Sequence, residues 1–308
     1  MDFFISLFSD PIAFWSSHSL LIGQIGINGI IATSMFLVLY SGQLSLAAPG
    51  FMAIGAYGSV LMSNYWHTPG VLNTLTATLV AGVIGFLVGL PVLRLRGVFL
   101  AIATIGFIEA LRLGVILNVP ITGKGLGLSN TASADPLGGI NIILVSLVVI
   151  VFLVWRLTKG RLGNAWAAIR QDELAALSQG IHVARYKMIA FVISALMAGY
   201  AGALESHLVF HVDPGDAQYG VTRAVQVLTF AVLGGSGFVL GPVVGAMIIT
   251  LLPYIFDAAG PYINIVSGIF LIVVIIFRPQ GIVGRGGLAI IRPSWWPRRA
   301  RVSAATPG

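Results

Sequence analysis

Long apolar runs recur along this chain, and they constrain its fold more than any other feature of the sequence. Each run is close to the ~20 residues that an α-helix needs to cross the hydrocarbon core of a bilayer. The runs are continuously apolar and lack the alternation of a transmembrane β-strand, so helices are favoured over a β-barrel. Nine segments are expected to be membrane helices: 20–40, 44–62, 71–92, 98–118, 138–157, 187–205, 221–235, 238–254 and 261–277.

The expected fold is therefore an all-α polytopic membrane protein, in which residues 1–308 form a single transmembrane domain. Only 9% of the residues are charged and the mean hydropathy is +0.96. A soluble chain of this length could not bury so much apolar surface. The segment 221–235 is short, which makes it a candidate half-span or re-entrant segment and keeps eight spans as the alternative count.

Two glycine-rich segments, 41–55 and 234–246, suggest an internal repeat. Each begins with a polar turn and continues into an apolar run that contains proline. Transporters are often built from repeats of this kind, with binding sites at broken helices between them. Broken or re-entrant segments and an internal repeat are therefore candidate features of the fold.

The lysines and arginines predict the orientation of the chain. If the polar stretch 156–187 lies in the cytoplasm, all of the 17 basic residues except Arg112, Lys124 and Arg223 fall on the cytoplasmic side. Such an excess marks the inner face of a membrane protein. The expected topology has the N-terminus outside, a cytoplasmic loop at about 158–186 and a cytoplasmic tail at about 278–308.

The composition also argues against several kinds of site. The chain has no cysteine, which excludes disulfides, thiolate metal sites and a cysteine nucleophile. The net charge of +7 is read as the membrane orientation signal and not as a sign of nucleic-acid binding. His207 and His211 have a helical metal-ligand spacing, but Leu208 stands where a zinc protease has glutamate, so polar contacts at a helix end are favoured over a metal site.

The cytoplasmic loop is expected to contain a short helix from Trp166 to Gln179, with Asn164 as N-cap and Gly180 at its end. Its small side chains would allow it to seat in a groove of a partner protein. The same helix could lie on the bilayer and offer its four large apolar side chains, Trp166, Ile169, Leu174 and Leu177, to lipid. The residues alone leave both interpretations open.

Charged and polar residues inside the apolar segments are candidates for a transport path. Glu109 and Arg112 are three residues apart on one helix, so they are expected to pair. No series of acidic or histidine residues runs through successive segments, which argues against a proton-coupled carrier. Hydroxyl and amide groups that face a bundle interior can line a path for a zwitterion or cross-link helices. These residues are Gln24, Asn28, Ser41, Gln43, Ser45, Thr104, Ser194, Gln226, Thr229 and Ser236.

Six sequence blocks, in order, resemble the permease subunits of bacterial ABC importers for branched-chain amino acids. The cytoplasmic loop supplies one of them, from Gly160 to Ile181, with a Glu-x-Ala-Ala-x-x-x-Gly pattern that begins at Glu173. The others lie at 41–57, 93–112, 185–203, 232–242 and 277–282. The chain departs from the family's pattern at 47–50 and 122–127, which bears on the substrate more than on the family.

The resemblance implies a function, a location and a set of partners. The chain would be a multi-pass protein of the bacterial plasma (inner) membrane and would form a translocation path for branched-chain amino acids with a second, homologous permease. Two ATP-binding cassette subunits would bind the cytoplasmic loop, and an external substrate-binding protein would deliver the substrate. The chain itself has no Gly-x-x-x-x-Gly-Lys-Ser/Thr motif, so it is expected to be no enzyme, to hold no cofactor or metal and to take its energy from the ATPases.

Two sets of residues follow as candidate sites. The coupling contacts to the ATPase are expected at Arg170, Asp172, Glu173, Ala175, Ala176 and Gly180. The translocation path is expected at Gly42, Gln43, Ser45, Thr104, Glu109, Gly234, Gly235 and Ser236. The alternative functions are the same architecture with urea, short amides or a sugar as substrate, a stand-alone secondary carrier or channel, and an intramembrane enzyme. The last would need a nucleophile or metal set that the segments do not offer.

Overall fold

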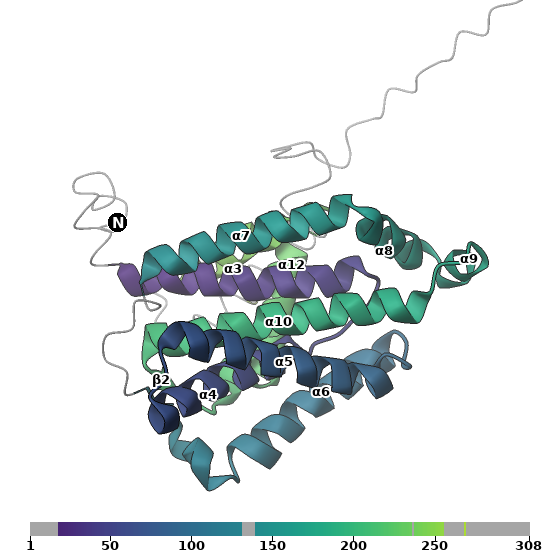
Figure 1. Ribbon diagram of the computed structural model, residues 1–308. Helices are drawn as coiled ribbons and strands as arrows, with labels where there is room; N and C mark the ends of the chain where they lie inside the picture. Colours follow the sequence, from purple (N-terminus) through teal and green to yellow (C-terminus); the bar gives the residue numbers. More distant parts are fainter. Residues whose placement is uncertain (1–17, 131–138, 236, 256–267, 269–308) are drawn as a thin grey trace, which may run out of the picture.

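A computed structural model describes residues 18–130, 139–235, 237–255 and 268, and the chain forms a helical bundle (Figure 1). The long helices are α3 Ser19–Tyr40, α4 Ala48–Trp66, α5 Gly70–Val92, α6 Val98–Glu109, α7 Ile140–Lys159 and α10 Val183–Val209. The shorter elements are η1 Ala110–Ile116, η2 Pro120–Thr122, η3 Lys124–Leu126, β1 Leu128–Ser129, α8 Arg161–Gln171, α9 Glu173–Ser178, β2 His211–Val212, α11 Asp216–Tyr219, α12 Val221–Gly234 and α13 Gly241–Ile255.

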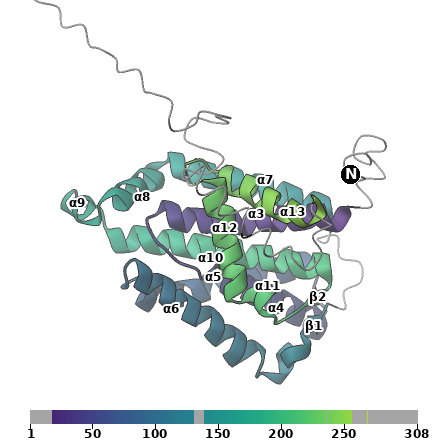
Figure 2. The same cartoon turned by 180° about the vertical axis from the view of Figure 1, so that it is seen from behind.

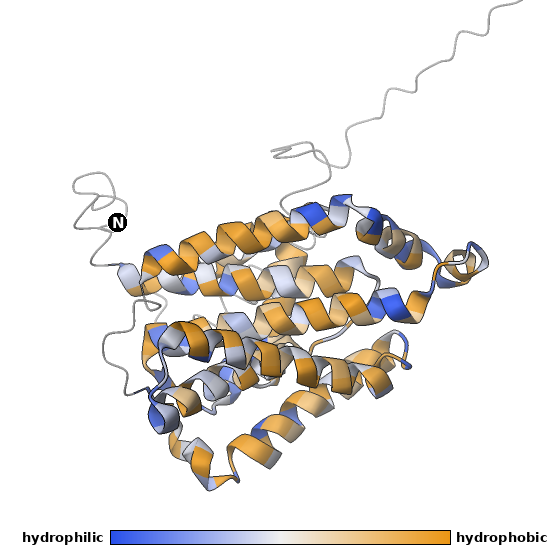
Figure 3. Cartoon of the chain, viewed as in Figure 1, coloured by the Kyte–Doolittle hydropathy of each residue, from blue (hydrophilic) through white to orange (hydrophobic). Residues whose placement is uncertain are grey.

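Eight of the nine expected membrane segments coincide with helices, and the ninth, 261–277, lies outside the described residues. In the described part of the chain, five helices are long and apolar enough to cross a membrane: α3, α5, α6 together with η1, α7 and α10. An all-α membrane protein is therefore confirmed, whereas the count of eight or nine spans stays a prediction. The 20-residue α7 exposes apolar side chains along most of its length, including Val148 and Phe152, as a lipid-facing helix does (Figure 3).

The centre of the bundle is the crossing of α4 and α10. Glycines allow the two backbones to touch: a Cβ on Gly55 would lie 1.9 Å from the carbonyl oxygen of Gly199. A Cβ on Gly202 would likewise lie 1.9 Å from the carbonyl oxygen of Met52. Close approach through small residues is the usual way in which membrane helices associate, because lipid offers no hydrophobic driving force. α3 and α5 cover this crossing on either side, and nearly all of the middle of α3 is buried.

Two interruptions of the helical bundle lie in the glycine-rich segments 41–55 and 234–246, between helices that the sequence predicted as separate. Residues 43–47 between α3 and α4 have no regular secondary structure, and α4 begins at Ala48, four residues later than expected, with Pro49 in its first turn. Part of the open backbone is satisfied by a side chain, since the Leu46 amide donates to Thr104 Oγ1 at 2.9 Å. Non-helical backbone at this depth is tolerated only where protein or water satisfies it.

The second interruption separates α12 from α13. The two helices meet at Gly234 and Gly241, where a Cβ on Gly234 would lie 1.9 Å from the Gly241 carbonyl oxygen. Figure 2 shows α12 running steeply across the long helices instead of alongside them. This inclination fits the short seventh segment, which was a candidate for a half-span or re-entrant piece.

The loops gather at two opposite ends of the bundle, as the basic residues predicted. The α5–α6 turn with Arg94 and Arg96 lies at the same end as α8 and α9 (Figure 1). The opposite end carries the small antiparallel sheet, in which Leu128 pairs with Val212 and Ser129 with His211. The cytoplasmic tail expected at 278–308 lies outside the described residues.

Candidate functional site

The cytoplasmic loop forms two helices instead of the single one that the sequence predicted. α8 ends at Gln171, the backbone of Asp172 is extended with φ −157°, and α9 begins at Glu173. The Asp172 carboxylate accepts hydrogen bonds from the amides of Leu174 and Ala175, at 2.8 and 3.1 Å. Asp172 is therefore the N-cap, and the prediction that Asn164 caps the helix is wrong because Asn164 lies inside α8. The predicted end at Gly180 is confirmed, with φ +81° directly after α9.

Both short helices are held by the start of α10. Trp166 is fully buried, and its indole nitrogen donates to the Tyr186 carbonyl oxygen at 2.8 Å. Ile169 of α8 and Ala176 of α9 pack with Val183 in a small apolar cluster. The interpretation that Trp166 and Ile169 face lipid is therefore wrong, since both side chains are inside the protein.

The opposite face of α9 is exposed and apolar. Leu174 and Leu177 are 69% and 48% exposed, and Ala175 beside them is exposed as well. Figure 1 shows α9 projecting beyond the ends of the long helices. The loop thus presents a rigidly mounted apolar ridge, and large exposed apolar groups on such an element mark an interaction surface.

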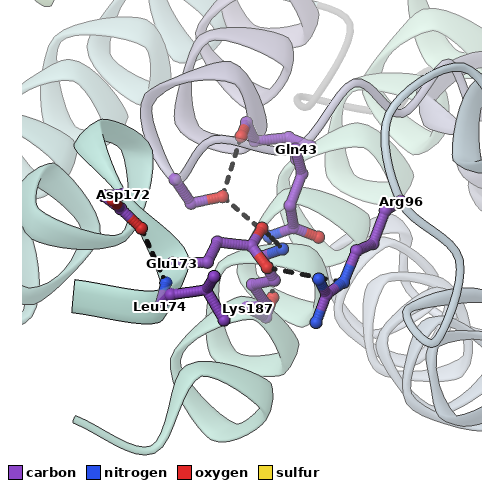
Figure 4. Close-up of polar contacts among 8 residues, drawn as sticks. Gln43, Arg96, Asp172, Glu173, Leu174 and Lys187 are labelled. Atoms are coloured by element: carbon purple, nitrogen blue, oxygen red, sulfur yellow. Dashed lines mark hydrogen bonds and ion pairs between the residues drawn. The ribbon is translucent and has the colours of Figure 1, made fainter. Parts of the chain in front are cut away.

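Glu173 anchors α9 to two other parts of the chain (Figure 4). Its carboxylate forms an ion pair with Lys187 at the start of α10, and Arg96 approaches it at 3.7 Å from the α5–α6 turn. Lys187 is nearly buried, while Arg96 is 71% exposed. Neither partner was predicted from the sequence, although the two cations stood among the basic residues assigned to this side.

This ion pair predicts unequal effects for two substitutions that each remove one charge. Glu173→Gln leaves the Lys187 ammonium nearly buried without a carboxylate, so we expect a loss of about 2 kcal/mol in unfolding free energy, less than for a fully buried pair. Arg96→Gln removes an exposed partner and should cost less than about 0.5 kcal/mol. Denaturation in mixed micelles with increasing SDS would measure both. Equal losses for the two variants would show that Lys187 is not the main partner.

The irregular segment 41–47 after α3 is attached to the same place. The Gln43 amide nitrogen donates to the Lys187 carbonyl oxygen at 3.0 Å and to Ser41 Oγ at 2.7 Å, while its amide oxygen is buried without a partner among the described residues (Figure 4). Gly42, with φ +80°, lies against the backbone of Arg170. The structure therefore places Gly42 and Gln43 at the junction with α8 and α10, and their predicted part in the path remains a prediction.

Gly42 and Gly180 form a matched pair for testing this junction. Both have a positive φ that costs a residue with a Cβ about 1–2 kcal/mol. A Cβ on Gly42 would also lie 3.1 Å from the Arg170 Cα, whereas nothing lies within 4 Å of one on Gly180. We expect Gly180→Ala to cost about 1 kcal/mol of unfolding free energy and Gly42→Ala at least about 2 kcal/mol. Equal thermal stability of the two variants in detergent would contradict the close contact between segment 41–47 and α8.

Among the remaining predicted path residues, Ser45, Thr104, Gly234 and Gly235 are buried and Glu109 is half-buried. Ser45 bonds the Ala47 amide at 3.3 Å, and Thr104 Oγ1 both accepts from Leu46 and donates to the Ala101 carbonyl oxygen at 2.9 Å. The expected pairing of Glu109 with Arg112 is confirmed, with 2.8 Å between Oε2 and Nη2. Gly234 and Gly235 form the turn before α13, and Ser236 lies outside the described residues.

The two histidines have polar side-chain contacts. His207 Nε2 lies 3.0 Å from Ser59 Oγ, and its Nδ1 lies 3.2 Å from Asn130 Nδ2. His211 contacts Ser129 Oγ at 3.1 Å. Residues 18–130, 139–235 and 237–255 contain no group of three or more potential metal-binding side chains.

Comparison with known proteins identifies the family. The family described as "Branched-chain amino acid transport system / permease component" matches residues 18–278. The permease protein LivM of the high-affinity branched-chain amino acid transport system is 32% identical in Salmonella typhimurium, over 91% of this chain and 71% of that protein. LivM of Escherichia coli is 33% identical over 84% of this chain and 66% of its own length.

A second kind of permease matches over a shorter region. LivH of Escherichia coli, from the same named transport system, is 31% identical over 144 residues, which is 46% of each chain. No solved structure gives a significant match. With a family match over most of its length, this chain belongs to the branched-chain amino acid transport system permease family and is a transport subunit, not an enzyme.

Proposed function

We propose that the chain is the transmembrane permease subunit of an ATP-driven importer and that it forms the translocation path for branched-chain amino acids together with a second permease. Family membership supports the transport role, and the names of LivM and LivH support both the substrate class and the pairing of two permeases. The chain spans 71% and 66% of the length of the two LivM proteins it matches, so the whole importer's activity is inferred and not observed.

The mounting of α9 is the observation that carries this proposal. A helix with an exposed apolar ridge is fixed to the bundle by the Ala176 cluster and by the Glu173–Lys187 ion pair. If a partner covered this ridge, the burial would contribute about 1.5–3 kcal/mol of binding free energy for each large side chain. We assign Leu174, Ala175 and Leu177 as the surface that seats in a groove of an ATP-binding cassette subunit. Arg170, Asp172 and Gly180 shape this contact from its edges.

Movement of α9 would reach the bundle through the junction at segment 41–47. Glu173 holds Lys187, whose carbonyl oxygen holds Gln43, and Gln43 lies in the break between α3 and α4. A displacement of α9 by the ATPase would therefore move α10 and segment 41–47 together. Coupling through a packed chain of contacts requires an element with two arrangements, and an interrupted helix can supply one.

The proposed surroundings follow from the same assignment. The importer would lie in a bacterial inner membrane, with the N-terminus and the β1–β2 end outside and the tail at 278–308 in the cytoplasm. Two ATPase subunits would bind at the α8–α9 end, and a substrate-binding protein would dock at the opposite end. The single transmembrane domain 1–308 would provide the path residues Ser45, Thr104, Glu109, Gly234 and Gly235.

Uptake into liposomes tests the proposal. The chain, its second permease, the two ATPases and the binding protein would be reconstituted together, and ATP-dependent uptake of labelled leucine, urea and glucose would be compared. We expect uptake of leucine only, and only with every component present. Uptake of urea or a sugar would overturn the substrate class, and leucine uptake by this chain alone would support a stand-alone carrier instead.

A further inference from the structure

A polar cavity of about 450 Å³ lies near the end of the bundle that carries the β1–β2 sheet. Residues of α3, α10, α11, α12 and α13 line it. Its volume falls in the range of about 300–1,000 Å³ that is usual for small-molecule sites. Most of the predicted path residues lie elsewhere, so this cavity is separate from the junction with α9.

Arg223 of α12 lines the cavity and is nine-tenths buried, with 9% of its surface exposed. Its guanidinium donates to Asn28 Oδ1 at 2.7 Å and to Gln226 Oε1 at 2.8 Å. Its Nε is buried and has no hydrogen-bond partner among the described residues. A buried guanidinium is costly when its hydrogen bonds go only to neutral acceptors and one donor has no acceptor at all.

The cavity wall holds this guanidinium in one place. Asn28 of α3, which accepts from Arg223, donates its own amide to Thr250 Oγ1 of α13 at 2.9 Å. Asn28 thus connects α3 to both α12 and α13 and fixes the position of the guanidinium. In the part of the chain that the structure describes, no carboxylate oxygen lies within 4 Å of its nitrogens.

Carboxylates and apolar groups complete the lining. Glu205 of α10 faces the cavity, and its Oε2 accepts a hydrogen bond from the Tyr219 hydroxyl at 2.9 Å. Asp213 lines the same cavity from the loop before α11. Ile27 and Ile249 contribute apolar surface beside these charges. Separate positive and negative groups beside apolar surface form an arrangement that a zwitterion with an apolar side chain can complement.

We propose that this cavity binds a free apolar α-amino acid, with the Arg223 guanidinium receiving the α-carboxylate and Glu205 receiving the α-ammonium group. The inference rests on the proposed function and adds a binding site within the permease. A carboxylate would supply the missing acceptor for Nε and neutralise the guanidinium through charge-assisted hydrogen bonds. Urea, short amides and sugars carry no charge and would offer Arg223 no anionic acceptor.

Protection of an introduced thiol tests the site, because the chain has no cysteine of its own. Ala217 lines the cavity and is exposed, so Ala217→Cys would report occupancy, while Leu126→Cys in the exposed η3 turn would be the control. The assembled complex in liposomes would be treated with a charged thiol reagent in the presence of leucine, leucinamide or 4-methylpentanoate. We expect leucine to slow modification of Ala217→Cys and not of Leu126→Cys. The two analogues, which lack one charge each, should require at least about 10-fold higher concentrations.

Removal of the Arg223 charge is the second test of the site. In the Ala217→Cys background, Arg223→Gln should raise the leucine concentration needed for protection at least about 10-fold. The control is Lys124→Gln, which removes an exposed cation and should leave that concentration unchanged. If Arg223→Gln fails to fold, the comparison of leucine with its two analogues in the unsubstituted cavity still decides. Equal protection by all three ligands, or transport of leucine without any protection, would overturn the inference and leave the proposed function intact. If leucine protects the thiol in a complex that does not transport leucine, the proposed transport function is contradicted and the proposed binding site is supported.

Discussion

Replacing Leu174 and Leu177 together by alanine is expected to uncouple the importer without unfolding the permease. Both side chains are largely exposed, at 69% and 48%, so the isolated chain should lose little stability. If an ATPase covers them, truncation removes about 3 kcal/mol of contact energy, or a ~100-fold weaker association. Co-purification of the ATPase subunits and ATP-dependent leucine uptake would both fall, while the melting temperature of the permease alone stays within a few degrees.

The matched control for this variant is Leu126→Ala. Leu126 is 87% exposed, but it lies in η3 at the opposite end of the bundle. Its truncation should leave ATPase binding unchanged. A double variant at Leu174 and Leu177 that binds the ATPase and transports at the normal rate would refute the assignment of α9 as the coupling surface.

Gly55→Ala is expected to be strongly destabilising, because Gly55 lies at the centre of the bundle. The added Cβ would lie 1.9 Å from the Gly199 carbonyl oxygen, a backbone atom that no rotamer change can move aside. Because α4 and α10 cross at this point, relief requires the two helices to separate and to lose the contacts around it. We expect a loss of at least about 3 kcal/mol in unfolding free energy, at the upper end of the range for overpacking.

Gly106→Ala is the matched control for helix packing. Gly106 also lies inside a helix, α6, but the residue is exposed and a Cβ added to it would have no neighbour within 4 Å. Alanine there should be neutral or stabilise the helix by up to about 1 kcal/mol. Unfolding midpoints in mixed micelles would compare the two variants. Equal midpoints would mean that the α4–α10 crossing is looser than the structure indicates.

Local patterns in the sequence were sufficient for most of the fold. The apolar runs located eight helices, because each helix that crosses a bilayer must satisfy its own backbone and remain apolar over its length. The spacing of Glu109 and Arg112 predicted their pairing, since residues three apart share one helix face. The basic residues also predicted which loops share an end of the bundle.

The coupling site needed information that no local pattern carries. The break at Asp172 arises because Trp166 and Ala176 must both dock on α10, which residues 183–209 supply from further along the chain. Helix propensity favoured one continuous helix through Asp172, and tertiary packing overrode it. The ion pair of Glu173 with Lys187 and the contact of Gln43 with Lys187 likewise join residues 14 and 144 positions apart.

The polar cavity was only partly visible in the sequence. Gln24, Asn28 and Gln226 were recognised as polar positions inside apolar segments, and all three line it. Arg223 was placed only near the outer face, because the excess of basic residues at 156–187 assigned the other face to the cytoplasm. Its burial depends on the steep crossing of α12 over α3, which sequence spacing does not reveal.

Cross-linking from α9 tests the central claim most directly. A photoreactive maleimide would be attached to an Ala175→Cys variant, whose exposed site lies between Leu174 and Leu177, in the assembled complex with cysteine-free partners. We predict a covalent adduct with the ATP-binding cassette subunit, and none from the same reagent on Leu126→Cys. An assembled, transporting complex in which Ala175→Cys labels only lipid or the permease itself would contradict the assignment of α9 as the contact through which ATP hydrolysis drives transport.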